Sequence, residues 1–356
     1  MGIALTRREG GLMKKLFGIG LSIFLTIALA ACGSQNAAAP QESGSSSTTA
    51  PAKELNLKIS VTVSEKDSWA IATKQWIEEV EKRTNGKIKM KMYANESLSN
   101  GNQPKGIEAV QNGSTDISLH STIIYSVLDP KFSAPSLPWL IPSYEQADKA
   151  MNGKAGEMLK EVIRSKGIEP LAYGESGYRQ ITNSKRPIEK PEDLKGLKIR
   201  TPSMEMMVST YKEFGGDPTV MNFAEVFTSL QQGVIDGQEN PLPIILNSKL
   251  YEVQDHLTVW NYMYDPIVFG MNKKLFDSLD PQTQEMFRET AQAAAKHQIQ
   301  LNREADAKVL AELKEKGMQV VELTPEQTKA FQEQVAPVID KYEEIIGKEM
   351  LDAFRN

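Results

Sequence analysis

The chain has 356 residues, and its formal net charge is −5 at pH 7. This mildly acidic balance argues against a nucleic-acid partner. Cys32 is the only cysteine, which excludes intramolecular disulfide bonds and a structural zinc site built from cysteines. The folded part must therefore be stabilised by burial of apolar side chains.

Residues 1–32 have the layout of a bacterial lipoprotein signal. A basic stretch precedes the apolar run LFGIGLSIFLTIALAA, which is too short for a comfortable membrane span and is typical of a secretory signal. The run ends at Ala31-Cys32 and resembles a lipobox, in which the cysteine receives the lipid. Met1 and Met13 are both possible starts. We expect lipidation of Cys32; the alternative is a plain signal peptide with a chance cysteine.

Residues 33–54 are rich in Ser, Ala, Thr, Pro and Gly. Such a segment cannot bury enough apolar surface to offset the entropy lost on ordering. We interpret it as a flexible tether between a lipid anchor and a globular body held outside the cytoplasm. That body, residues 55–356, is long enough to suggest two lobes rather than one core.

The body begins with strand-like alternation and helix-like periodicity in turn. The predicted strands are residues 55–63, 87–93 and 116–121, and the predicted helices are residues 67–86 and 104–113. In the first helix Trp69, Trp76 and Val80 share one face, and Gly86 is a stop signal. Strand-helix-strand units at this spacing predict an α/β fold.

The second half continues the pattern. The predicted elements are a helix at 144–167 and strands at 169–176 and 196–201. Pro202 ends the last strand, and Ser203 is a suitable N-cap for a helix that begins at Met204. Asp280-Pro281 opens a helix without Gly or Pro until Gly317. At ~1.5 Å per residue it would be on the order of 50 Å long, so we expect it to contact both lobes.

The sequence contains no positive signal for catalysis. The three histidines, His120, His256 and His297, are far apart in the chain. There is no Walker-type phosphate loop, no HExxH metal motif and no G-x-S-x-G nucleophile motif outside the tether. We therefore expect neither an enzyme nor a bound cofactor or metal.

Two arginines are better candidates for ligand binding. Arg200 ends a strand just before a helix N-terminus, and ligands of open α/β sheets bind at that edge. An arginine there can form a two-point ion pair with a carboxylate. Arg179 also follows a strand, among small polar residues. For both, a structural salt bridge is the alternative.

Two further residues have a functional and a structural interpretation. Phe223 lies at a turn before a helix, where it could be a ligand platform or a core aromatic. Asn240 precedes Pro241, and Asn followed by Pro is a good helix start. Asn240 is therefore either an N-cap or an amide aimed at a ligand.

Long segments of the body closely resemble the solute-binding proteins of TRAP transporters, of the DctP type. The resemblance covers nearly the whole chain from Leu55. It is carried by WIEEVEKRTNGKIKMKMY, IEAVQNGSTDISL, SAPSLPWL, GYRQITNSKRPIEKPEDLKG, GLKIRTPS, MNFAEVFTSLQQGVIDGQENP and LYEVQDHLTVWNY.

The resemblance implies a two-lobed, periplasmic-binding-protein-like α/β fold with mixed sheets and a long lobe-bridging helix. It also implies closure on a small organic acid, which is then delivered to a membrane permease. Arg200 matches the arginine that pairs with the ligand carboxylate, and Arg179 matches a second ligand-facing arginine. Phe223 matches an aromatic that packs on the ligand, and Asn240 an amide that reaches the carboxylate. Tyr262 falls at a position of variable contacts.

The front lobe matches the family pattern poorly. Ser121 stands where some sugar-acid binders place a glutamate, so sugar-acid specificity is not carried over. The remaining candidates there are Trp69, Asn102, Gln103 and Tyr125, and each has a structural role as its alternative.

The sequence therefore predicts an extracytoplasmic receptor for a small organic acid, with a separate TRAP-type permease as partner. An extracytoplasmic ligand sensor and a two-lobed hydrolase are the alternatives. The ligand and the oligomeric state are not readable. The expected lobes are residues 55–175 with 266–302, and residues 176–265 with 303–356.

Overall fold

The computed structural model describes residues 54–356. The predicted signal, Cys32 and all but the last residue of the predicted tether lie outside the described residues. No helix within 54–356 is both long and apolar enough to cross a membrane.

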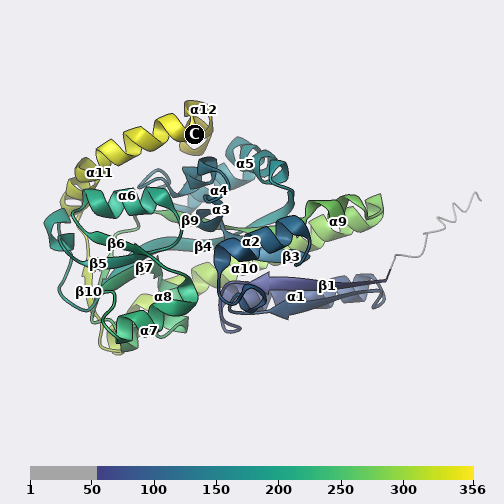
Figure 1. Cartoon of the computed structure of the whole chain (residues 1–356), viewed down its shortest axis with the longest axis horizontal. Helices are drawn as coiled ribbons and strands as arrows, with labels where there is room; N and C mark the ends of the chain where they lie inside the picture. Colours follow the sequence, from purple (N-terminus) through teal and green to yellow (C-terminus); the bar gives the residue numbers. More distant parts are fainter. Residues whose placement is uncertain (1–53) are drawn as a thin grey trace, which may run out of the picture. The chain divides into compact units, whose positions relative to one another are not determined.

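A single mixed sheet runs through the described chain (Figure 1). Its strands follow the order β2-β1-β3-β9-β4-β7-β5-β6, with β8 paired to β4 and β10 paired to β8. The strands are β1 (Leu55–Val61), β2 (Ile88–Tyr93), β3 (Ile117–Ser121), β4 (Ile168–Asn183), β5 (Lys198–Thr201), β6 (Asp217–Val220), β7 (Gly237–Pro241), β8 (His256–Val259), β9 (Tyr264–Asn272) and β10 (Gln319–Glu322).

The helices cover both halves of this sheet. The α-helices are α1 (Ser68–Arg83), α2 (Gln103–Asn112), α3 (Thr122–Tyr125), α4 (Tyr144–Asn152), α5 (Lys154–Ser165), α6 (Glu205–Glu213), α7 (Val226–Gln231), α8 (Leu242–Asn247), α9 (Lys273–Asp277), α10 (Pro281–Glu315), α11 (Pro325–Ile346) and α12 (Lys348–Arg355). Short 3-10 helices are η1 (Ser97–Ser99), η2 (Pro130–Ser136), η3 (Pro191–Leu194), η4 (Phe223–Glu225) and η5 (Leu250–Glu252).

Strands β4 and β9 join the two halves of the sheet. Residues 168–178 of β4 pair antiparallel with β9, whereas residues 179–183 pair antiparallel with β7. The outer strands β1 with β2, and β5 with β6, pair in parallel. The predicted α/β fold with mixed strand directions is therefore confirmed. A register shift in β4 between Glu175 and Gly177 precedes its last two pairs with β9, which are at Gly177 and Tyr178.

Local sequence explains the front elements. Helix α1 begins after Asp67, whose side chain accepts a hydrogen bond from the backbone N–H of Trp69, as expected of an N-cap. Trp69, Trp76 and Val80 are all buried in one apolar cluster with β1 and β3. The predicted helical face is confirmed.

The long helix α10 bridges the two halves of the structure. Asp280 caps its N-terminus by accepting from the N–H of Thr283. Phe287 and Ala291 pack in the apolar cluster of α1 and β1, whereas Val309 and Leu313 pack in the cluster of α7 and α8. Figure 1 shows α10 passing from the side of α1 to the side of α8. The predicted bridging helix is confirmed.

We expect a proline in the exposed middle of α10 to destabilise the protein strongly. Ala307 is exposed, so Ala307→Pro acts through the backbone and should cost about 3 kcal/mol or more. Ala307→Gly is the matched control and should cost only about 1 kcal/mol. Urea denaturation measures both free energies of unfolding, and equal midpoints for the two variants would contradict a continuous helix.

Three local predictions were wrong or incomplete. Ser203 does not cap α6, because the N-cap is Met204 and no side chain caps this helix. The helix expected at 144–167 is two helices, since the chain is extended at Gly153. The strand expected at 169–176 continues to Asn183, because β7 and β8 supply partners that the local pattern does not reveal.

The C-terminal helices contact elements of both expected lobes. Helix α11 packs on α6 and on η2, and α12 packs on α4, α5 and η2. The expected lobe boundaries remain predictions, with β4, β9 and α10 as the elements that pass between the two halves.

Candidate functional site

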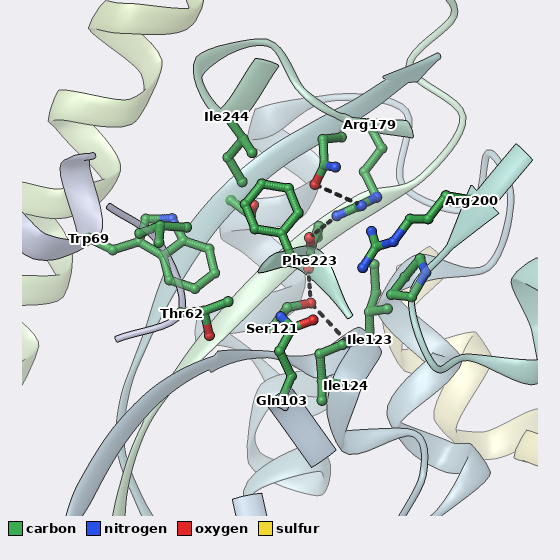
Figure 2. Close-up of a pocket in the computed structure, with 15 residues that line it drawn as sticks. Thr62, Trp69, Gln103, Ser121, Ile123, Ile124, Arg179, Arg200, Phe223 and Ile244 are labelled. Atoms are coloured by element: carbon green, nitrogen blue, oxygen red, sulfur yellow. Dashed lines mark hydrogen bonds and ion pairs between the residues drawn. The ribbon is translucent and has the colours of Figure 1, made fainter. Parts of the chain in front are cut away.

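A cavity lies where the two halves of the sheet meet (Figure 2). It is bounded by the C-terminal ends of β1, β3, β5 and β7 and by the segments that follow these strands. The lining residues are Thr62, Val63, Trp69, Gln103, Ser121, Ile123, Ile124, Ser176, Arg179, Arg200, Pro202, Phe223, Asn240, Ile244 and Asp265. This is the sheet edge at which α/β proteins bind ligands.

Arg200 contributes to this cavity a cation that forms no ion pair with any residue of 54–356. It lies in β5, and its side chain is 1% exposed. Its Nε donates to the carbonyl of Met221 at 2.9 Å, but Nη2 has no hydrogen-bond partner among the described residues. Burial lowers the pKa of Arg200 to about 10; the charge of Glu239 opposes this shift and that of Arg179 adds to it. A buried guanidinium with a free N–H group is a site for an anion.

Phe223 lies beside this cation. Its ring centroid is 5.8 Å from the guanidinium carbon of Arg200, within the range of a cation–π contact. Phe223 begins η4, is only partly buried, and points into the cavity with Arg200 (Figure 2). It also packs against two apolar clusters, so it has a packing role, and its role as a ligand platform stays a prediction.

Arg179 is engaged by acids within the protein. Its Nε and Nη2 donate to the carboxylate of Glu239, and Nη1 donates to Asp265 Oδ2 at 2.5 Å. Nη2 also donates to Asn240 Oδ1 at 3.1 Å. Burial alone would lower the pKa of Arg179, but the charge and hydrogen bonds of Glu239, with Asp265, raise it above the ordinary value. The salt-bridge alternative therefore describes Arg179. Of its five N–H groups, the second one on Nη1 has no acceptor among residues 54–356, because Nη1 bonds there to Asp265 alone.

Asn240 does not cap a helix. It lies in β7, and the N-cap of α8 is Pro241. Its Nδ2 donates to Gln238 Oε1, and its Oδ1 accepts from Arg179. The amide lines the cavity, so the N-cap interpretation was wrong and the ligand-facing one stays a prediction.

The other candidates fall into two groups. Trp69, Gln103 and Ser121 line the cavity. Tyr262, Tyr125 and Asn102 do not. Tyr262 is buried and donates to Glu239 Oε2 at 3.0 Å, Tyr125 is fully buried, and Asn102 caps α2 by accepting from the N–H of Lys105. Direct ligand contact by these three residues is not supported by their placement.

Sequence reasoning missed the two acids, Glu239 and Asp265. Both are at most 1% exposed. Their partner Arg179 is 60 and 86 residues away in the chain, so no local pattern connects them. The run of polar residues at 236–240 was the available signal for a polar site, but it does not indicate which of these side chains contacts Arg179. Within residues 54–356, no group of acidic, histidine or cysteine side chains is arranged to hold a metal ion.

Comparison with known proteins finds similarity over most of the described chain. The family model "DctP: Bacterial extracellular solute-binding protein, family 7" matches residues 59–345. The chain is 35% identical to the 2,3-diketo-L-gulonate-binding periplasmic protein YiaO of Escherichia coli K12, over 75% of this chain and 80% of that protein.

Two solved structures are similar over most of this chain. One is a TRAP periplasmic solute-binding protein from Ralstonia eutropha H16 with bound (S)-2-acetolactate, at 34% identity and a TM-score of 0.82, covering 84% of this chain and 97% of that one. The other, from Polaromonas sp. JS666 with bound D-erythronate, has 36% identity and a TM-score of 0.81, covering 85% and 98%.

Proposed function

Because the chain belongs to family 7 of the bacterial extracellular solute-binding proteins, the DctP family, we propose that it binds a small organic acid through an arginine–carboxylate clamp and delivers it to a TRAP-type permease. The family is one of transport proteins that act outside the cytoplasm, and not an enzyme family. Its solved relatives hold 2-acetolactate and D-erythronate, both carboxylates.

One observation supports the clamp: the Nη2 of Arg200 is buried in the cavity and has no hydrogen-bond partner within residues 54–356. A ligand carboxylate placed there would accept this N–H in a charge-assisted hydrogen bond. Phe223 would cover the apolar part of the ligand, and Asn240 would supply an amide beside the carboxylate. Arg179 would contribute its remaining N–H and hold Asn240 in position.

Binding would be coupled to closure of the two halves around the cavity. The lining residues come from both halves, whereas β4, β9 and α10 pass between them. A cavity that is lined from two halves, with only a few elements connecting these halves, is the arrangement expected of a binding protein that closes about a hinge. The closed form would then be the form that the permease recognises.

Calorimetry with a panel of carboxylates and their amides tests the binding step. We expect at least one carboxylate to bind and its amide to bind at least ~100-fold more weakly, because the amide cannot form the ion pair. Native mass spectrometry of protein from its own host identifies the acid that co-purifies. Equal affinity for acid and amide would contradict the clamp.

The delivery step needs a separate test. Uptake of labelled ligand by cells that express this protein with a TRAP permease should require both components. If the protein binds the acid but uptake does not depend on it, ligand sensing replaces transport as the function of the same site.

We also propose that Cys32 anchors the protein outside the cytoplasm. The lipobox precedes a segment suited to a tether, so Cys32→Ser should release the protein from membranes or leave an uncleaved precursor. Labelling cells with a fatty acid checks this, with the wild type as the matched control. Equal label in the variant and the wild type would contradict lipidation at Cys32.

A further inference from the structure

Most of the charged groups at the cavity are paired with one another within the protein. Its charged lining residues are Arg179, Arg200 and Asp265, and Glu239 lies directly behind Arg179. Two cations and two acids sum to zero, but they are not equally available. Glu239 and Asp265 both contact Arg179, while Arg200 has no acid within salt-bridge distance among the described residues.

Asp265 makes the region beside Arg179 unfavourable for a second anion. It lies in β9 and is 1% exposed. Its Oδ2 accepts from Arg179 at 2.5 Å, and its Oδ1 accepts from the hydroxyl of Ser121. A carboxylate oxygen can accept more than one hydrogen bond. Asp265 can therefore accept from a ligand hydroxyl, and it repels a ligand carboxylate.

The rest of the cavity offers no cation. Apart from Arg179, Arg200 and Asp265, its lining consists of neutral polar and apolar side chains. A second cavity of about 220 Å³ adjoins it and shares Thr62, Gln103 and Phe223. The charged lining residue there is Glu96, whose carboxylate accepts hydrogen bonds from Ser60, Thr62 and Ser99 and contacts His120.

The second cavity is suited to hydroxyl groups. Asn95, Asn247 and Ser248 line it together with the side chain of Gln103. These groups both donate and accept hydrogen bonds, so they can pair with neutral hydroxyls. A carboxylate in the same place would be desolvated without a counter-ion, which is strongly unfavourable in protein interiors.

We propose that the ligand of this protein is a hydroxylated monocarboxylate, and that Asp265 excludes dicarboxylates. This inference rests on the proposed function, because it takes the single carboxylate to be held by Arg200. The ligand's hydroxyl groups would then face Asp265 and the neutral polar side chains of the second cavity. A dicarboxylate would leave its second charge unpaired wherever it was placed.

Matched pairs of aldonates and aldarates test the proposal directly. Glycerate and tartronate, erythronate and meso-tartrate, and gluconate and glucarate differ only in the terminal group, which is a primary alcohol or a carboxylate. Calorimetry at about pH 8 keeps the free carboxyl groups ionised. In the best-binding pair we expect the aldonate to bind at least ~100-fold more tightly than the aldarate.

Asp265→Asn supplies the critical comparison. It keeps the shape and the hydrogen bond from Ser121 but removes the negative charge, so the aldonate-to-aldarate ratio of affinities should fall at least about tenfold. Asp306→Asn is the matched control, because Asp306 is a partly buried acid that lines neither cavity and accepts from Tyr144 at 3.1 Å. The aldonate-to-aldarate affinity ratio of this control variant should stay within about twofold of the wild-type ratio.

The outcomes distinguish a failure of the role of Asp265 or of the substrate class from a failure of the proposed function. A wild type that binds aldarates as tightly as aldonates, or an Asp265→Asn variant with an unchanged ratio, overturns the role of Asp265. If no aldonate binds but another carboxylate does, the hydroxylated substrate class is overturned while the arginine clamp stands. If no carboxylate binds at all, the proposed function fails and this inference fails with it.

Discussion

Arg200→Ala is expected to weaken binding of the acid ligand by roughly two to four powers of ten, because removing one partner of a buried ion pair costs ~3–5 kcal/mol. The ligand carboxylate would still be desolvated in the cavity but would lose the one cation there that has no acidic partner in the described part of the chain. Arg200→Lys keeps the charge yet loses the planar two-point geometry, so it should also bind poorly. Calorimetry measures all three proteins.

A ligand analogue checks that the loss comes from this one contact. Replacing the carboxylate by an amide should mimic Arg200→Ala. Combining both changes should cost much less than the sum of the two, because each removes the same interaction. If Arg200→Lys binds within about twofold of wild type, the two-point clamp is wrong.

The same arginine should have the opposite effect on the ligand-free protein. Its pKa is lowered to about 10, chiefly by burial, which means that the guanidinium is still charged at neutral pH but that folding is less favourable for the charged form than it would be without this burial. Arg200→Met removes an unpaired buried charge and keeps much of the volume. We expect the free energy of unfolding to rise by ~1–4 kcal/mol, measured by urea denaturation without ligand. A stable variant that no longer binds separates recognition from folding.

Arg179→Met is expected to destabilise the ligand-free protein by ~3–5 kcal/mol, because it leaves the buried carboxylates of Glu239 and Asp265 without their counter-ion. The methionine has a similar length, so packing changes little. Replacement by methionine should therefore lower the free energy of unfolding at Arg179 and raise it at Arg200. Urea denaturation of both variants under one condition makes the comparison.

The pH dependence of the Arg179→Met variant follows from the two stranded acids. Burial raises the pKa of Asp265 already in the wild type, and loss of Arg179 raises it further. A carboxyl whose folded-state pKa exceeds its unfolded value binds more protons when folded. Stability is therefore fully present below the unfolded pKa and is lost as pH rises toward the folded pKa. The destabilisation should shrink as the solution is acidified.

Neutralising the acids should rescue the variant. Adding Glu239→Gln and Asp265→Asn to Arg179→Met removes both stranded charges, so most of the lost free energy of unfolding should return. If Arg179→Met is as stable as the wild type, or if the triple variant is no more stable than Arg179→Met, the buried ion-pair network does not stabilise the fold.

Much of this protein follows from its sequence. The capped start at Asp280-Pro281 and the absence of Gly or Pro until Gly317 specify α10 to within two residues. Alternation specifies β1 and β2, and spacing places Arg200 at the edge of a strand. These are local effects of backbone propensity and apolar periodicity, which a short window of sequence contains. The motif resemblance, spread over the whole body, identified the family.

The tertiary structure decided which arginine is free. In the sequence, Arg179 and Arg200 both stand at or just after the end of a predicted strand, and sequence reasoning gave both a ligand-facing role. In the structure, β4 continues past Arg179 to Asn183. Strand register places Glu239 and Asp265 against Arg179, and it leaves Nη2 of Arg200 without a hydrogen-bond partner in the part of the chain that the structure describes. Strand pairing fixes such contacts through backbone hydrogen bonds between β4, β7 and β9. A one-residue slip would turn each side chain to the other face, and that long-range register is not written in any local pattern.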